Sequence, residues 1–126
     1  MNRPLHYAFI HGRVDAVKLL LEHGAYTYRR DAIGRNYLHE TAESGHIEMM
    51  KLFIDAGTDV NAITAYSNNT PLHYAAYMGN IDAVRLLIDH GANINQKDDK
   101  SRTPLDDALR CNKTDVVELL KSHGAT

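Results

Sequence analysis

Apolar residues recur at helical spacing in short segments of the chain, and glycine residues separate these segments. In residues 80–90, four apolar side chains fall at positions i, i+3, i+6 and i+7: Ile81, Val84, Leu87 and Ile88. Side chains at this spacing lie on one face of an α-helix, so the segment predicts an amphipathic helix with one apolar stripe. Gly91 ends it, because the residue after a helix often adopts a positive φ angle.

A second helix is predicted immediately upstream, from Pro71 to Met78. Thr70 is a good N-cap, and Pro71 fits the first helical position because its missing N–H has no partner there. Gly79 ends this helix in the same way as Gly91 ends the next. A polar connector follows Gly91, so the segment consists of two short helices and a loop.

This pair of helices recurs along the chain. A leucine returns at intervals of 33 or 34 residues: Leu5, Leu38, Leu72 and Leu105. A glycine follows each leucine by nineteen positions: Gly24, Gly57, Gly91 and Gly124. A second glycine follows by seven positions as Gly12, Gly45 and Gly79, with Asn112 in the fourth copy. We therefore predict one domain, residues 1–126, of four repeats at about 1–34, 35–67, 68–100 and 101–126. Two helices this short cannot bury an apolar face alone, so the repeats must stack.

The third repeat carries the most informative motif. Its segment Thr70-Pro71-Leu72-His73-Tyr74-Ala75 resembles the T-P-L-H-x-A signature of the ankyrin repeat, and the period agrees. Residues 3–8 and 103–108 match less fully, and residues 36–41 match least. The resemblance implies an all-α ankyrin-repeat solenoid of stacked helix-turn-helix units, with β-turn fingers nearly perpendicular to the helices. It also implies no cofactor, no catalytic centre, and a signature histidine that hydrogen-bonds between neighbouring repeats.

The two outer repeats depart from the common pattern. In the fourth repeat, Thr114 and Lys121 stand where the other repeats have apolar residues. This polar face is typical of a C-terminal capping repeat. The first repeat lacks such a pattern, so three alternatives stay open: its apolar surface is exposed, a partner covers it, or upstream sequence is missing.

Two predicted fingers also differ from the pattern. The 34-residue interval places one extra residue in the finger before Leu72, where Ala65 replaces the aspartate found as Asp31 and Asp98 in the flanking fingers. This is either a specific contact site or a tolerated loop insertion. In the first finger, Tyr28 stands where later repeats have asparagine. Tyrosine is enriched at interface hot spots, while variation in a loop alone would also explain it.

Composition excludes several classes of protein. The 126 residues are 44% hydrophobic and 24% charged, which is typical of a globular chain. The net charge of −2 gives no basic excess for nucleic-acid binding. No apolar run reaches the ~20 residues that span a membrane, and no secretory signal is evident. A single cysteine indicates a reducing compartment. We expect a cytoplasmic protein; a nuclear location, or secretion after loss of a signal peptide, remains an alternative.

Catalytic or metal chemistry is not indicated. Six of the eight histidines share repeat offsets: His6, His39, His73, His23, His90 and His123. Residues that recur with the fold usually serve the fold. Neither a paired-cysteine motif nor a His-Glu-x-x-His pattern is present, and Ser, His and Asp occur without a nucleophile elbow. We therefore expect no enzyme activity, no metal and no cofactor.

The resemblance implies that a protein partner binds to the finger tips and the concave, first-helix face. Counting from the repeat leucines and adding the unusual first finger, we predict these partner-binding residues: Tyr66, Ser67, Asn69, Tyr77, Met78, Ile33, Arg35, Glu43, Arg102, Arg110, Tyr26 and Tyr28. Tyr66, Tyr77 and Met78 are the most anchor-like, because aromatic residues and methionine are enriched in interface cores. Scattered exposed side chains of this kind would otherwise mean nothing.

The expected function is therefore an interaction module that binds a protein as an adaptor or an inhibitor. Two alternatives remain. The first repeat could mediate self-association into a dimer or longer stack, or the chain could be an accessory domain of an enzyme. Neither the partner nor the pathway follows from the sequence.

Overall fold

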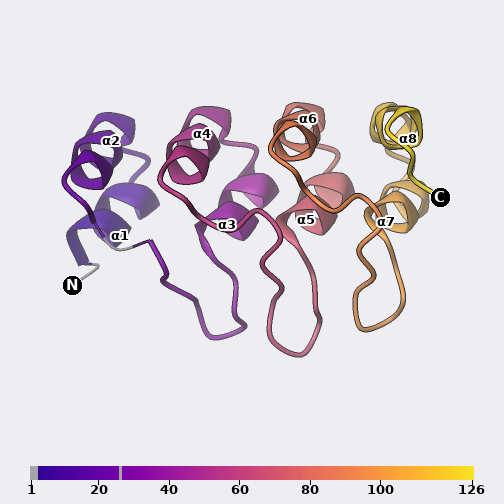
Figure 1. Cartoon of the computed structure of the whole chain (residues 1–126), viewed down its shortest axis with the longest axis horizontal. Helices are drawn as coiled ribbons and strands as arrows, with labels where there is room; N and C mark the ends of the chain where they lie inside the picture. The colour runs from indigo at the N-terminus through magenta and orange to yellow at the C-terminus, as the bar shows by residue number, and fades with distance from the viewer. Residues whose placement is uncertain (1–2, 26) are drawn as a thin grey trace.

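Four pairs of helices stand side by side in a single row (Figure 1). The computed structural model describes residues 3–25 and 27–126, and within them the chain forms eight helices and no strand. The helices are α1 (Arg3–Ile10), α2 (Val14–Glu22), α3 (Tyr37–Ser44), α4 (Ile47–Asp55), α5 (Pro71–Met78), α6 (Ile81–Asp89), α7 (Pro104–Arg110) and α8 (Thr114–Ser122). The all-α stack of helix pairs expected from the sequence is confirmed.

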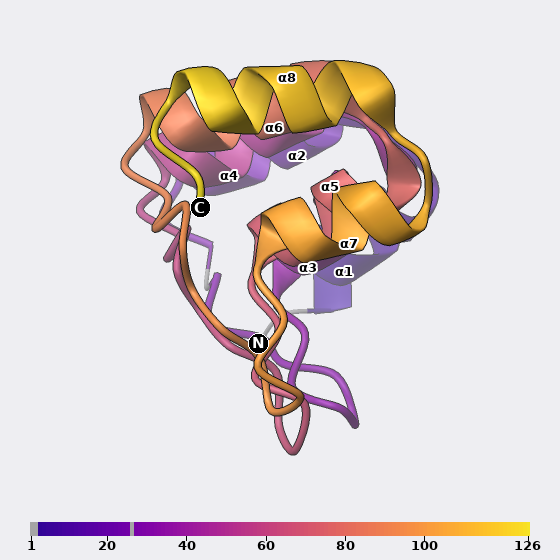
Figure 2. The same ribbon diagram turned by 90° about the vertical axis from the view of Figure 1, so that its right-hand side faces the viewer.

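The helices form two layers, and the connections between pairs project away from both. α1, α3, α5 and α7 make the first layer, and α2, α4, α6 and α8 make the second (Figure 2). We call the connections the first finger (residues 27–36), the middle finger (56–70) and the last finger (90–103). α3 packs against α5 and α5 against α7, while each second-layer helix packs against the next. In cross-section the stack is therefore L-shaped, with the helix pairs as one arm and the three fingers as the other (Figure 2).

The predicted apolar stripes form the core between the pairs. In α6, Val84 and Leu87 are fully buried, and Ile81 and Ile88 are partly buried against them. The repeat leucines are buried as well: Leu5, Leu38, Leu72 and Leu105. Burial of one such side chain contributes roughly 1.5–3 kcal/mol, which is how helices too short to persist alone become stable in the stack.

Aromatic rings fill the space between the first two repeats. Tyr37 stands at the first position of α3, where the next two repeats have proline. Its ring stacks on Phe53 at a centroid distance of 4.4 Å and meets the edge of Phe9 at 4.8 Å. Tyr37 and Phe53 are both fully buried. The weakest match to the signature motif therefore supplies the largest side chain of this part of the core.

Each first-layer helix from α3 onward begins with a reciprocal cap. Thr70 accepts a hydrogen bond from the His73 backbone at 3.3 Å, and the Thr70 N–H donates to His73 Nδ1 at 3.0 Å. Asn36 with His39 and Thr103 with Asp106 make the same arrangement. Such a capping box satisfies backbone N–H groups that the helix leaves unpaired. The capping residues thus fix where each finger ends and each helix begins.

Two of the signature histidines, His39 and His73, also join neighbouring repeats, as the sequence resemblance implied. His39 Nε2 lies 2.9 Å from the Asn69 carbonyl, and His73 Nε2 lies 2.9 Å from the Arg102 carbonyl. Because Nδ1 accepts the capping N–H, the proton must reside on Nε2, which donates to the carbonyl. One imidazole therefore caps its own helix and holds the next finger.

Departures at the fourth repeat have a structural explanation. Asn112 takes a positive φ of 56°, as Gly12, Gly45 and Gly79 do at the same offset. Asparagine tolerates this left-handed conformation better than most residues. Thr114 and Lys121 are exposed on α8, as their polar character predicts.

Within residues 3–25 and 27–126, the helices are too short and polar for any of them to cross a membrane.

Candidate functional site

A groove lies on the surface between the fingers and the first helical layer. It has a volume of about 440 Å³. Its lining comes from all three fingers and from α3, α5 and α7, and it comprises Ile33, Arg35, Glu43, Ser67, Asn69, His73, Tyr74, Tyr77, Met78, Asp98, Asp99, Lys100, Arg102, Asp107 and Arg110. The groove therefore lies on the concave side of the L, across three repeats.

The first and last fingers hold their groove residues by the same turn. Asp31 and Asp98 each accept two backbone N–H groups through Oδ1, at 2.8–3.1 Å for Asp31 and 2.9 Å for Asp98. A carboxylate that bonds backbone two residues on is a common way to close a turn. Gly34 and Ser101 then take positive φ angles of 84° and 60°. The turn leaves Oδ2 of each aspartate for another partner: Arg35 donates to that oxygen of Asp31, whereas Asp98 lines the groove.

The middle finger, which has the extra residue, is built differently. Thr64 replaces the missing aspartate: its hydroxyl accepts the Asn69 N–H at 3.1 Å. Tyr66 and Asn68 both have positive φ angles, 68° and 55°. A Cβ added to Gly34 would lie 2.6 Å from the backbone nitrogen of Ala65, so the first and middle fingers touch. Glycine at this point allows that approach.

The structure brings most of the predicted partner-binding residues to the groove. Ile33, Arg35, Glu43, Ser67, Asn69, Tyr77, Met78, Arg102 and Arg110 all line it. Tyr77 and Met78 sit at the end of α5 with exposed fractions of 52% and 45%. Tyr66 is 89% exposed on the middle finger and does not line the groove, and neither does Tyr28 on the first finger. Tyr26 lies outside the described residues.

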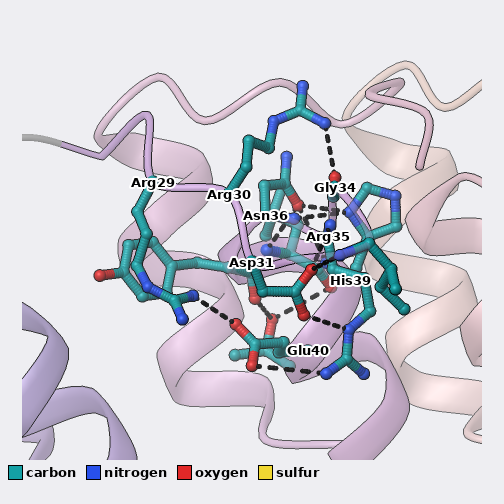
Figure 3. Close-up of polar contacts among 12 residues, drawn as sticks. Arg29, Arg30, Asp31, Gly34, Arg35, Asn36, His39 and Glu40 are labelled. Atoms are coloured by element: carbon teal, nitrogen blue, oxygen red, sulfur yellow. Dashed lines mark hydrogen bonds and ion pairs between the residues drawn. The ribbon is translucent and has the colours of Figure 1, made fainter. Parts of the chain in front are cut away.

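Ion pairs stabilise the first finger against α3 (Figure 3). Arg35 reaches Asp31 through Nε at 2.7 Å, Glu43 through Nη1 at 3.2 Å and Glu40 through Nη2 at 3.9 Å. Arg29 reaches the other oxygen of Glu40 at 3.3 Å. Burial raises the pKa of Glu40, although both arginines oppose the shift. Arg35 therefore bridges the carboxylates of this repeat, and Arg29 pairs with Glu40 from its other oxygen.

Arg30 links the first finger to the middle finger. Its Nη1 donates to the Gly34 carbonyl at 2.7 Å and to the Ile63 carbonyl at 3.1 Å. Backbone hydrogen bonds also join neighbouring fingers. The Ala65 N–H donates to the Ile33 carbonyl at 2.9 Å, and the Asp99 N–H donates to the Ser67 carbonyl at 3.0 Å. These bonds tie the finger array together, so the groove wall is held in place before any partner arrives.

A cluster of three ionisable residues lies on the groove floor at the fourth repeat. A nitrogen of His73 and one carboxylate oxygen each of Asp98 and Asp107 lie within 4.8 Å of one another. Both imidazole nitrogens are engaged, Nδ1 by the Thr70 N–H and Nε2 by the Arg102 carbonyl. A metal ion would need a lone pair that His73 already uses. The cluster is therefore better suited to a hydrogen-bond donor than to a metal.

Sequence reasoning missed this cluster as a site. The sequence pattern places Asp98 only in a predicted finger, and Asp107 only within the fourth copy of the signature motif, residues 103–108. A signal was present, because carboxylates stand seven positions before and two after the repeat leucine in the second and fourth repeats only: Asp31, Glu40, Asp98 and Asp107. The burial of Asp107, which is 7% exposed, could not be read from that pattern.

Several known proteins are similar to this chain in sequence. A model of the family described as ankyrin repeats (3 copies) matches residues 1–64 and 38–126. The chain is 30% identical over 121 residues to the ankyrin repeat protein nuc-2 of Neurospora crassa, covering 96% of this chain and 11% of that protein. A putative ankyrin repeat protein of Rickettsia bellii is 36% identical over 53 residues, 42% of this chain and 16% of the relative.

A third relative is protein phosphatase 1 regulatory subunit 27 of Homo sapiens, 35% identical over 58 residues, which cover 46% of this chain and 38% of that protein. The chain thus spans less than half the length of each of these relatives. The family model, by contrast, covers the chain from end to end. Together with the stacked helix pairs and the inter-repeat histidines, this match shows that the chain belongs to the ankyrin repeat family.

Proposed function

We propose that this chain binds a protein partner in the groove between its fingers and first-layer helices, as an adaptor or an inhibitor. Ankyrin repeats are generally protein–protein interaction modules. The observation that carries the proposal is the exposure of Tyr77 and Met78 inside a hollow, beside charged residues of the fingers. Exposed aromatic and methionine side chains in a groove are typical anchors of an interface core with a polar rim.

The rigidity of the surrounding frame supports the same proposal. Capping boxes fix the helix starts, and hydrogen bonds from His39 and His73 fix the fingers. A preorganised surface loses little conformational entropy when it binds, so more of the contact energy appears as affinity. The relative named as a regulatory subunit of a phosphatase is consistent with a module that acts by binding another protein rather than by catalysis.

Paired variants test the groove as the docking face. Immobilised wild type is used to capture a partner from a native lysate, and the captured protein is then titrated against Tyr77→Ala with Met78→Ala. We expect binding at least about tenfold weaker, because truncation of hot-spot residues usually costs this much or more. The matched control is Tyr7→Ala with Leu19→Ala, which removes side chains of similar exposure, 57% and 55%, from the first repeat. Equal loss in both variants, or loss only in the control, would contradict the proposal.

Self-association is the second candidate, and one observation favours it. The two helices of the first repeat, α1 and α2, expose three large apolar side chains: Tyr7, Ile10 and Leu19. Such side chains can mark a protein interface when they are contiguous. A molar mass that rises with concentration in light scattering, and that returns to the monomer in the Tyr7 and Leu19 variant, would replace the groove proposal with this one. A constant monomer mass would remove it.

A further inference from the structure

The second and fourth repeats carry the same pair of carboxylates in different states. Asp31 with Glu40, and Asp98 with Asp107, occupy equivalent positions around the repeat leucine. Both aspartates use Oδ1 to accept two backbone N–H groups of the finger turn. In each pair, the aspartate Oδ2 and the second carboxylate are the acceptors that the turn does not use.

In the second repeat, this acceptor pair already holds arginine. Arg35 donates to Asp31 at 2.7 Å and approaches Glu40 at 3.9 Å, and Arg29 reaches Glu40 at 3.3 Å (Figure 3). A guanidinium group is planar and carries five N–H donors, so it can bridge two carboxylates. The chain thus contains its own example of what this arrangement binds.

In the fourth repeat, the equivalent place is open to the groove. Gln96 stands at the position of Arg29, and Arg102, the counterpart of Arg35, forms no ion pair with Asp98 within the described chain. Asp107 is 93% buried by residue, yet no hydrogen bond between described residues reaches its carboxylate. Its one ion pair is with Arg110 at 3.5 Å, and the Arg110 side chain is 48% exposed. A buried carboxylate with so little compensation is costly to keep.

We propose that Asp98 and Asp107 form a receptor site for an arginine side chain of the protein partner. The inference rests on the proposed protein-binding role of the groove and names the chemistry of its partner there. The two carboxylate oxygens lie within 4.8 Å, a separation that one guanidinium can bridge. Tyr77 and Met78 line the same groove and offer apolar surface to the methylene stem of the arginine. The partner's guanidinium would compete with the exposed Arg110 for Asp107.

The test uses a small arginine probe, so it does not depend on the identity of the partner. Nα-acetyl-arginine N-methylamide is titrated into isotope-labelled protein at low ionic strength, with the norleucine analogue as the apolar control. We expect saturable shifts of the amide signals of residues 98–102 and 107–110 with the arginine probe alone. Asp98→Asn with Asp107→Asn should weaken binding at least about tenfold, because charge-assisted hydrogen bonds are roughly twice as strong as neutral ones.

Two matched controls separate this site from general electrostatics. Asp55→Asn with Asp89→Asn makes the same charge change on exposed residues at the ends of α4 and α6 and should leave probe binding intact. Arg110→Gln should strengthen probe binding, because it removes the internal competitor, while Arg85→Gln on the exposed side of α6 should not. Circular dichroism of every variant checks that the helices remain folded.

Several results would overturn the inference. An absent or non-saturable response of the wild type would do so, as would binding that survives in the Asp98 and Asp107 variant. Saturable binding of zinc alone that disappears in this variant, without any response to the arginine probe, would reassign the cluster to a metal. The two proposals fail separately: a failed probe leaves partner capture through Tyr77 and Met78 intact, whereas a partner retained by the Tyr77 and Met78 variant overturns the groove itself.

Discussion

His39 shows how much one side chain contributes to an ankyrin-type stack. It is fully buried, accepts the Asn36 N–H at 3.0 Å, and donates to the Asn69 carbonyl of the next finger at 2.9 Å. These bonds require the neutral imidazole with its proton on Nε2. A charged ring at this place would lose the acceptor at Nδ1 and would also carry a poorly solvated charge.

The stability of the fold should therefore fall in mild acid. Burial is the main cause that lowers the pKa of His39 from 6.5 to about 4, so between these pH values the unfolded chain binds a proton that the folded chain resists. The free energy of unfolding should decrease by about 3 kcal/mol from this residue as pH drops from 7 to 4. Urea unfolding over this pH range measures it. The His39→Gln variant should be less stable than the wild type at pH 7, and its free energy of unfolding should depend less steeply on pH. An equal pH dependence in both proteins would contradict the role of His39.

The middle finger is the element in which local strain and exposure coincide. Tyr66 combines a φ of 68° with an exposed fraction of 89%, so its ring gains little from the rest of the chain. A non-glycine residue in this region costs roughly 1 kcal/mol. An exposed aromatic residue retained at such a cost is consistent with a contact made to another molecule.

Replacing this residue should stabilise the finger. Tyr66→Gly relieves the left-handed strain, and we expect the free energy of unfolding to rise by up to about 1 kcal/mol, less the greater entropy of glycine in the unfolded chain. Tyr66→Ala serves as the control, because it removes the same ring but keeps the strain and should show no gain. Thermal or urea unfolding of the three proteins decides the matter; equal stability of the glycine and alanine variants would rule out strain at this position.

Sequence and structure agree most closely where one residue determines the local backbone. Pro71 and Gly79 predicted the bounds of α5, and Asn112 was expected at a glycine offset where it does adopt a positive φ. Offsets from the repeat leucine also predicted that Tyr77 and Met78 would lie together on the concave side. The open state of Asp107 could not be predicted, because Arg35 and Arg102 share an offset and yet only Arg35 pairs with its aspartate. Rotamer choice on a surface is not visible in a repeat pattern.

At the scale of the whole molecule, the stack is unevenly buried from end to end. In the second layer, α2 buries Val17 alone and α8 buries Val116 and Leu120, whereas α4 and α6 each bury three residues. Among the described second-layer helices, α4 and α6 each pack against two others of that layer, whereas α2 and α8 each pack against one. Stability in a repeat array is approximately a sum of repeat and nearest-neighbour terms, so it should vary along the row.

Amide hydrogen exchange should reveal this gradient. We expect backbone amides of α4 and α6 to exchange at least about tenfold more slowly than those of α2 and α8, because the outer pairs can open without disrupting the centre. Rates corrected for intrinsic exchange of each residue serve as the internal control. Equal protection in all four helices would indicate a single cooperative unit instead, and the outer repeats would then be coupled to the centre more tightly than their burial suggests.

The contact between repeats and the recognition of a partner use different parts of the same finger residues: the backbone carbonyl and the side chain. His73 holds the last finger by the carbonyl of Arg102, while the side chain of that same residue faces the groove. His39 holds the middle finger by a hydrogen bond to the carbonyl of Asn69, whose side chain is a neutral amide, unlike the guanidinium of Arg102. Since every amino acid supplies a carbonyl, substitutions at the finger positions can retune which partner is accepted without weakening the coupling of one repeat to the next. The side chains that line the groove can therefore change, in evolution or by design, while the packing between repeats stays the same.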